Sequence, residues 1–213
     1  MVRLAFEDRR QEADRVTPDT LGPLAASHGD TREVAAVIRT ARPGDGAGLA
    51  RVHIETWQAA YKQQLPDEFL DGMSSQLEQR TAWWERMIAS AADRRWTQFV
   101  AEDAEGIVGF ATCGPSEGDD ADPYVGQVYA IYVHPRGWRQ GIGRQLFERA
   151  AQVLREAGYS TAVLWVLETN ARARRFYEVA GWQPDGGTKS ETRGDVVLHE
   201  VRYRTALAPP GSP

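Results

Sequence analysis

The hydrophobic positions of this chain change their spacing several times, and each change predicts an element of secondary structure. Apolar or alternating runs predict strands over residues 34–40, 96–102, 107–113, 125–133, 161–166 and 196–204, and the polar stretch between Trp182 and the last strand is expected to be a loop. Apolar positions three or four residues apart predict helices over 45–61, 75–91, 142–157 and 170–181, with a helical turn at 66–71. Asp45 is expected to cap the first helix, and the apolar face of the helix at 142–157 is expected to consist of Ile142, Leu146, Ala150, Val153 and Ala157. This order of strands and helices predicts an α/β or α+β fold around a mixed sheet.

The ends of the chain lack this periodicity. Residues 1–34 are polar, contain Pro and Gly, and predict a mobile extension before one domain over 35–207, with 208–213 as a C-terminal tail. A chain of 213 residues that is 42% hydrophobic can bury one core. We expect a cytoplasmic protein with no membrane segment, because the chain has no long apolar run and its N-terminus lacks the apolar stretch of a secretory signal.

Residues 127–146, QVYAIYVHPRGWRQGIGRQL, form the most informative segment. An apolar strand ends at His134-Pro135, and a glycine-rich turn leads into a helix at Gly141-Ile142-Gly143. The start of a helix presents free backbone N–H groups and the positive end of its dipole, and glycine lets an anion approach them. The segment therefore predicts a phosphate-binding turn, although an ordinary tight turn between strand and helix has the same pattern.

Two common phosphate-binding patterns do not fit. The third glycine of the dinucleotide fingerprint is missing, and no acidic residue closes the next strand at the expected distance. A P-loop requires Gly-Lys-Ser/Thr, which occurs nowhere in the chain. An oxidoreductase that binds NAD is therefore disfavoured.

A second segment, residues 170–182, follows the strand at 161–166 and reads NARARRFYEVAGW. With the first segment it resembles the GNAT superfamily, the N-acetyltransferases that use acetyl-CoA. The matching residues are Ile131 to Pro135, Arg139 to Arg144, Asn170, Phe176-Tyr177-Glu178 and Gly181-Trp182. The family often has Arg or Gln three residues before the first loop glycine, where this chain has Trp138.

The resemblance implies a fold and a cofactor site. It implies a mixed, mostly antiparallel central sheet with helices on both faces, whose central strands at 125–133 and 161–166 splay apart to admit the pantetheine arm of CoA. The residues that it assigns to acetyl-CoA are Ile131, Tyr132, Val133, Arg139, Gln140, Gly141, Ile142, Gly143, Arg144 and Asn170. Asn170 is expected to orient the pantetheine amides or to cap its helix, and the two roles are compatible.

The resemblance also implies direct attack by the acceptor amine, without an acyl-enzyme. A backbone N–H near 131–133 would stabilise the developing oxyanion, and such donors contribute about 3–4 kcal/mol. Tyr177 is the expected general acid for the departing thiolate, although simple aromatic packing is its alternative interpretation. The pKa of a tyrosine, about 10, lies about 1.5 units above that of a thiol, so this proton transfer costs only about 2 kcal/mol.

The general base and the acceptor site are less defined. Gln127 stands where some family members have a carboxylate, and the remaining candidates are Glu55, Tyr129, Glu168 and His134. The resemblance places Trp57 and Tyr61 at the acceptor site, although core packing explains either residue equally well. The acidic loop at 115–123 is either an attractor for a cationic amine or a solvated surface loop.

Charge and cysteine content narrow the function further. The chain has 25 basic and 30 acidic residues, which argues against general nucleic-acid binding, yet residues 134–175 hold eight arginines against three glutamates. This local excess suits the phosphates of CoA. The arginines expected around the phosphate-binding turn or at the start of the next helix are Arg136, Arg139, Arg144, Arg172, Arg174 and Arg175. Cys113, the only cysteine, lies in an apolar run and is expected to be a buried strand residue, and the four histidines show no metal-ligand spacing.

Two functions from different classes remain. The first is an acetyl-CoA-dependent N-acetyltransferase that acts on a primary amine of a small molecule, peptide or protein. The second is an acyl-CoA-binding sensor without turnover, which the lack of an obvious base favours and the presence of Tyr177 and Asn170 disfavours. The expected partners are acetyl-CoA and an amine acceptor, with a homodimer as a further possibility and neither nucleic acid nor membrane.

Overall fold

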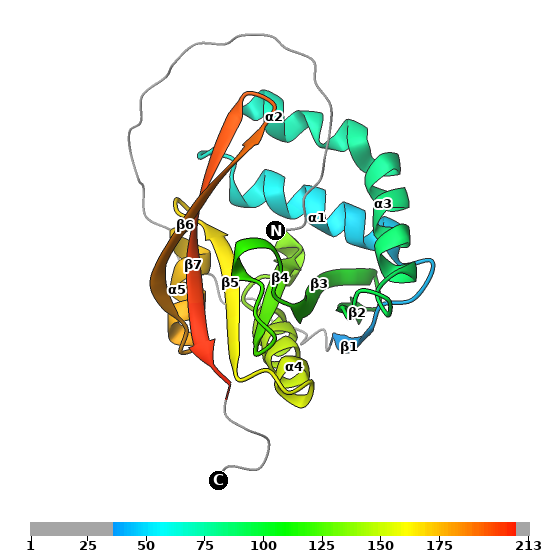
Figure 1. Cartoon of the computed structure of the whole chain (residues 1–213). Helices are drawn as coiled ribbons and strands as arrows, with labels where there is room; N and C mark the ends of the chain where they lie inside the picture. The colour runs from blue at the N-terminus through cyan, green and yellow to red at the C-terminus, as the bar shows by residue number, and fades with distance from the viewer. Residues whose placement is uncertain (1–35, 208–213) are drawn as a thin grey trace.

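The computed structural model of the protein describes residues 36–207 (Figure 1). The predicted extension at 1–34 and the tail at 208–213 lie outside the described residues.

One seven-stranded sheet runs through the described residues, in the order β1-β2-β3-β4-β5-β7-β6 (Figure 1). The strands are β1 (Val37–Thr40), β2 (Thr97–Asp103), β3 (Gly106–Pro115), β4 (Val125–Val133), β5 (Thr161–Leu167), β6 (Gln183–Arg193) and β7 (Val196–Ala206). Only β4 and β5 pair in parallel, and every other neighbouring pair is antiparallel. The predicted mixed, mostly antiparallel sheet is confirmed.

Helices cover both faces of the sheet, as predicted. They are α1 (Gly46–Ala60), α2 (Asp67–Gly72), α3 (Leu77–Ala89), α4 (Ile142–Glu156) and α5 (Ala171–Val179). The cluster around Leu146 and Leu154 joins α4 and α5 to one face, whereas α1 and α3 bury Leu49 and Trp84 on the other. Each fully buried leucine stabilises the fold by about 1.5–3 kcal/mol. In Figure 1, α4 and α5 lie behind the sheet.

The buried face of α4 differs slightly from the predicted one. Ile142, Leu146 and Ala150 are buried as expected, but Leu154 completes the face, while Val153 is half-buried and Ala157 is exposed. Because a helix turns once in 3.6 residues, a step of four residues from Ala150 to Leu154 keeps the side chain over the sheet.

The two central strands separate after four paired residues. Pairing between β4 and β5 runs from Val125 with Thr161 to Val128 with Leu164, although β4 continues to Val133 and β5 to Leu167. A register shift between β3 and β4 lies next to Cys113, where β4 begins to leave β5. The C-terminal halves of these strands therefore face each other across a gap, as the resemblance implied.

The start of α1 is capped differently from the expectation. Asp45 occupies the N-cap position, but its carboxylate makes no capping bond to the helix. Instead it accepts from the Arg42 N–H and pairs with the Arg39 guanidinium. Burial raises the pKa of Asp45, but these bonds lower it by more, so the pKa lies below its usual value. Glu85 of α3 accepts from the N–H groups of Gly44 and Gly46, and so supplies the cap from a neighbouring helix.

The polar stretch before the last strand was predicted to be a loop, and this was wrong. Residues Gln183–Arg193 form the edge strand β6, which pairs with β7. Its sequence, QPDGGTKSETR, has no aliphatic or aromatic side chain apart from Pro184. Both faces of the strand are largely exposed, so no core position requires alternating hydrophobic residues.

Candidate active site

A cavity of about 400 Å³ lies in the gap between β4 and β5. Its walls come from both strands, from α1 and α5, from the turn before α4, and from one residue of β7. The predicted site residues that line it are Tyr61, Ile131, Tyr132, Val133, Arg139, Gly141, Ile142, Gly143, Arg144, Asn170 and Tyr177. Residues far apart in the sequence thus meet in one space.

The turn before α4 leaves its backbone N–H groups open. In the part of the chain that the structure describes, no acceptor bonds the N–H groups of residues 139 to 144, and the first bonded amide is Gln145, which donates to Gly141 O at 3.1 Å. Arg139 and Gly141 have φ of 66° and 77°. Left-handed residues within such a turn can direct successive N–H groups to one side, as in anion-binding nests.

Three arginines, Arg139, Arg144 and Arg172, line the cavity near this turn. The other arginines predicted around the phosphate are engaged elsewhere. Arg136 forms a two-pronged ion pair with Asp103, Arg174 donates to Tyr203 Oη and Glu168 O, and Arg175 lies 3.9 Å from Glu178.

Trp138, the residue that departs from the family pattern, bridges the two sides of the gap. Its indole N–H donates to Val133 O at 2.6 Å, and the Arg172 guanidinium lies 4.0 Å from the centre of its ring. Burial, and then the charge of Arg139, lower the pKa of Arg172. The indole therefore holds a cation from α5 against the turn before α4.

The backbone of β4 directs two further N–H groups into the gap. His134 N–H donates to Val108 O at 2.8 Å, which fixes the direction of the ladder toward β3. Since alternate residues of a strand direct their backbone groups to opposite sides, the N–H groups of Val133 and Ile131 point away from β3. Neither residue has a pairing partner in β5. Two backbone N–H groups of β4 therefore point toward the gap and have no partner in β5.

Tyr177, Asn170 and Tyr61 all line the cavity. Asn170 Oδ1 accepts from Ala173 N–H at 3.0 Å and so caps α5, while its Nδ2 donates to Tyr61 Oη at 2.9 Å. The Tyr177 hydroxyl has no hydrogen-bond partner among residues 36–207. Burial, followed by the neighbouring Tyr61 and Tyr132, raises the pKa of Tyr177, so its hydroxyl stays protonated.

Two predicted site residues lie outside the cavity. Gln140 turns its amide to Arg136 O at 2.8 Å. Trp57 is 1% exposed and packs behind Tyr61, with 4.9 Å between the ring centroids. Trp57 thus supports the wall that Tyr61 forms.

The candidate bases suggested by the sequence are poorly placed. Glu55 and His134 bond to each other, and neither they nor Glu168 line the cavity. Tyr129 lines it, but its hydroxyl donates to Pro115 O and its ring packs on Trp96.

Among the cavity-lining residues in the described range, the only carboxylate belongs to Glu200 of β7, which sequence reasoning missed. A signal existed, because Glu200 is two residues from the buried Leu198 and so shares its face of the strand. The signal was ambiguous, because Arg202 lies two residues further along the same face and a charged residue there suggests exposure.

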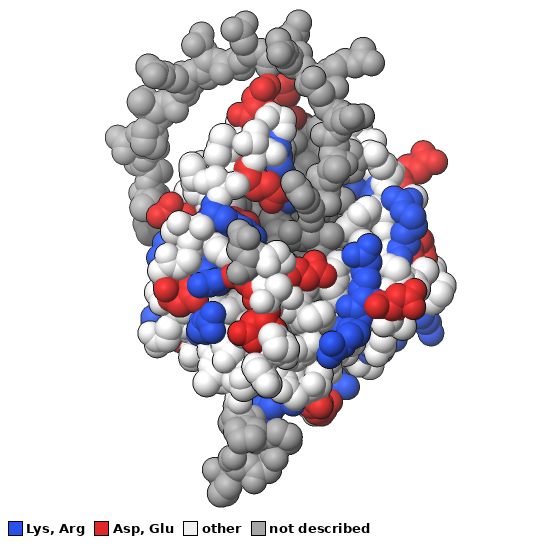
Figure 2. All heavy atoms as spheres, in the orientation of Figure 1, with Lys and Arg blue, Asp and Glu red and all other residues white. Residues whose placement is uncertain are grey.

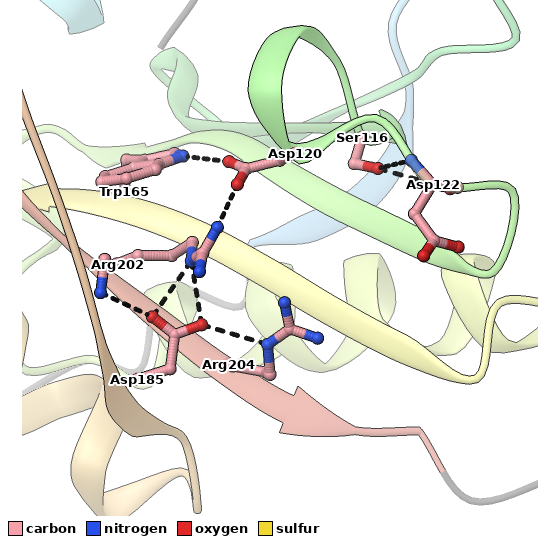
Figure 3. Close-up of polar contacts among 8 residues, drawn as sticks. Ser116, Asp120, Asp122, Trp165, Asp185, Arg202 and Arg204 are labelled. Atoms are coloured by element: carbon pink, nitrogen blue, oxygen red, sulfur yellow. Dashed lines mark hydrogen bonds and ion pairs between the residues drawn. The ribbon is translucent and has the colours of Figure 1, made fainter.

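The acidic loop at 115–123 is partly neutralised. Figure 3 shows Asp120 between the Trp165 indole, which donates to it at 2.8 Å, and Arg202, which pairs with it. Arg202 and Arg204 also meet Asp185, at 2.8 and 3.0 Å. A carboxylate held in this way contributes little field to a distant amine. Asp120 instead connects the loop to Trp165 of β5 and Arg202 of β7.

Other side chains limit the chemistry available. Cys113 is fully buried and burial raises its pKa to about 12, so it is a poor nucleophile. Within residues 36–207 no three His, Cys, Asp or Glu side chains gather as a metal site would require, and no helix there is long and apolar enough to cross a membrane. On the face drawn in Figure 2, basic and acidic side chains are interspersed.

Comparisons with known proteins identify the family of this chain. The model of the acetyltransferase (GNAT) family matches residues 49–182. The probable N-acetyltransferase Rv2775 of Mycobacterium tuberculosis is 32% identical over 177 residues, which cover 82% of this chain and 96% of that protein. The uncharacterized N-acetyltransferase YuaI of Bacillus subtilis is 33% identical over 134 residues, which cover 62% of this chain and 72% of that protein.

A solved structure shares the fold. YncA, a putative acetyltransferase from Salmonella typhimurium determined with its cofactor acetyl-CoA, superposes with a TM-score of 0.61 at 20% identity, over 84% of this chain and 97% of that one. The family match and the two relatives carry the assignment further than the fold. The chain therefore belongs to the GNAT acetyltransferase family, the acetyl-CoA-dependent N-acetyltransferases that its two motifs resemble.

Proposed function

We propose that the protein transfers the acetyl group of acetyl-CoA to a primary amine of a small molecule, peptide or protein by direct attack in a ternary complex. The observation that carries this proposal is the continuity of the cavity. It reaches from the open amides before α4, through the gap between β4 and β5, to side chains of α1 and β7. A donor and an acceptor can therefore approach one carbonyl carbon from opposite faces of the sheet.

The turn before α4 suits the diphosphate of CoA. Open N–H groups at a helix start attract anions, and Arg139, Arg144 and Arg172 add positive charge beside them. The pantetheine arm would extend along β4 and bond to the N–H groups of Ile131 and Val133, which have no partner in β5, with Tyr132 between them and Asn170 across the gap.

The same β4 amides suit the chemistry. An N–H group that points into the gap would stabilise negative charge on the acetyl oxygen, a contribution of about 3–4 kcal/mol. Tyr177 would then protonate the departing thiolate. Its raised pKa makes it a weaker acid than a free tyrosine, but the dry cavity that raises this pKa also disfavours a thiolate. Both effects have the same cause, so the cost of proton transfer stays small.

A covalent acetyl-enzyme is not part of this proposal. The buried thiol of Cys113 does not line the cavity, and its pKa of about 12 leaves it protonated. The acceptor nitrogen itself must therefore reach the thioester. We also propose a cytoplasmic location for this reaction, and a homodimer stays a prediction.

The proposal is tested by following thiol release from acetyl-CoA with a panel of amines and by weighing the protein after incubation with acetyl-CoA alone. We expect thiol release that depends on the amine, intersecting initial-rate lines, and an unchanged protein mass. An acetylated protein that passes its acetyl group to a later amine would contradict direct attack. Tight CoA binding without turnover on any amine would favour the sensor.

A further inference from the structure

The half of the cavity next to α1 contains a buried carboxylate with incomplete bonding. Glu200 is 3% exposed, and its Oε2 has no hydrogen-bond partner among the described residues. Lys189 Nζ lies 3.4 Å from this oxygen, so the two charges attract each other without a well-aligned hydrogen bond. A buried carboxylate in this state is costly, and a further donor in the cavity would lower that cost.

Lys189 also contacts a second residue, Trp165. Lys189 Nζ lies 4.3 Å from the centre of the Trp165 ring, and the Trp165 indole is itself fixed by Asp120 (Figure 3). Lys189 is paired with Glu200 in the register of β6 and β7 and does not line the cavity. One side of Glu200 therefore faces Lys189, and the cavity lies on another.

Glu200 also lies near two tyrosines that line the cavity, Tyr61 and Tyr132. Leu167 is its partner in β5, and Leu198 on the same face of β7 packs in one cluster with Tyr61. Burial is the main reason that the pKa values of Tyr61 and Tyr132 are raised, and the charge of Glu200 adds to both shifts. The carboxylate thus borders the space in which an acceptor would meet the acetyl group.

We propose that Glu200 binds the ammonium group of the acceptor and removes its proton, so that the acceptor is a primary amine with no carboxylate beside its nitrogen. This inference rests on the proposed function. A cation completes the bonding of Glu200, whereas an adjacent carboxylate would be repelled by it. Side-chain amines, peptide N-termini and simple alkylamines fit, and free α-amino acids do not.

The protons balance in this scheme. Glu200 takes one proton from the ammonium and later returns it to water. The neutral nitrogen forms a bond to the acetyl carbon while the carbon–sulfur bond breaks. Tyr177 protonates the thiolate and regains a proton from the nitrogen as the amide forms. The products are the amide, the free thiol and one proton.

The test compares two isosteric Glu→Gln variants with a third variant at Lys189. Glu200→Gln keeps the shape but cannot accept a proton, and Glu168→Gln makes the same change at an exposed position outside the cavity. Lys189→Gln removes the cation that pairs with Glu200 and contacts the Trp165 ring. With 2-phenylethylamine, Nα-acetyl-lysine amide and a short peptide as acceptors, we expect Glu200→Gln to lower kcat/KM by about 100-fold or more, as for a lost general base. Glu168→Gln should match the wild type, and Lys189→Gln should retain most of the activity. The melting temperature and CoA affinity of each variant report on folding and on the other half of the cavity.

The outcomes distinguish a failure of the role proposed for Glu200 from a failure of the proposed acetyltransferase function. If Glu200→Gln stays folded and acetylates amines as fast as the wild type, the inference is wrong and the acetyltransferase stands. If Lys189→Gln loses as much activity as Glu200→Gln, the ion pair is structural and Glu200 is no base. L-Phenylalanine should be acetylated at least 10-fold less efficiently than 2-phenylethylamine, and the reverse preference contradicts the proposed acceptor class. A wild type that acetylates no amine contradicts the proposed function itself, and the inference falls with it.

Discussion

The half of the cavity next to α4 is built largely from backbone within one stretch of chain, whereas the half next to α1 is built from side chains of separate elements. Residues 139–144 present their amides together because one turn and one helix start fix all of them. Tyr61, Asn170 and Glu200 come from the end of α1, the start of α5 and β7. The first half can therefore stay the same while the second changes, as binding one cofactor and varied acceptors requires.

The largest expected effect on catalysis comes from Tyr177→Phe, because the Tyr177 hydroxyl would act where the acetyl donor and the acceptor meet. We expect kcat to fall by about 100-fold or more while the affinity for acetyl-CoA changes only a few-fold, because the variant loses a proton donor and little packing. Tyr159→Phe is the control, since Tyr159 is equally buried but lies outside the cavity.

The pH profile gives a second measure of Tyr177. A pKa raised above the usual value of about 10 keeps the donor protonated as pH rises, so kcat should show no loss through Tyr177 between pH 7 and pH 10. Equal rates for wild type and Tyr177→Phe between pH 7 and 9 would remove this hydroxyl from the mechanism.

The next effect concerns the backbone half alone. Gly141→Val places a β-branched residue at φ 77°, which costs at least about 1 kcal/mol and turns the amides away from their present direction. We expect its Kd for CoA to rise about 10-fold or more. Gly158→Val introduces the same strain at φ 90° after α4 and away from the cavity. Calorimetric titration should find CoA affinity unchanged in this control, and equal weakening in both variants would mean that lost stability is the cause.

The sequence predicted the half of the cavity next to α4 better than the half next to α1. Gly141 and Gly143 follow a strand at a fixed spacing, so the open amides could be inferred from local pattern alone. Glu200 could not, because its position depends on the pairing of β5 with β7 and on where β4 leaves β5. The edge strand β6 was missed for a related reason, since its polar sequence has no alternating hydrophobic positions that would indicate a strand.

A smaller effect, on the KM for acetyl-CoA, should distinguish Arg172 from Arg144. Arg172 lies against the Trp138 ring, whereas the Arg144 side chain is 79% exposed and pairs with Glu148. A fixed cation acts on a phosphate more strongly than a solvated one. We expect Arg172→Gln to raise the KM for acetyl-CoA about 3- to 10-fold and Arg144→Gln by less than about 2-fold. Steady-state kinetics at low salt measure both, and the opposite order would show that Arg172 serves only to hold Trp138.

The most direct test observes the backbone N–H groups themselves. In an NMR titration of labelled protein with CoA, the amide resonances of residues 139–144 should shift together with those of Ile131 and Val133, and those of β6 should stay in place. If CoA fails to bind, or binds while the amides of residues 139–144 keep their positions, the cofactor does not lie on this turn and the central claim is wrong.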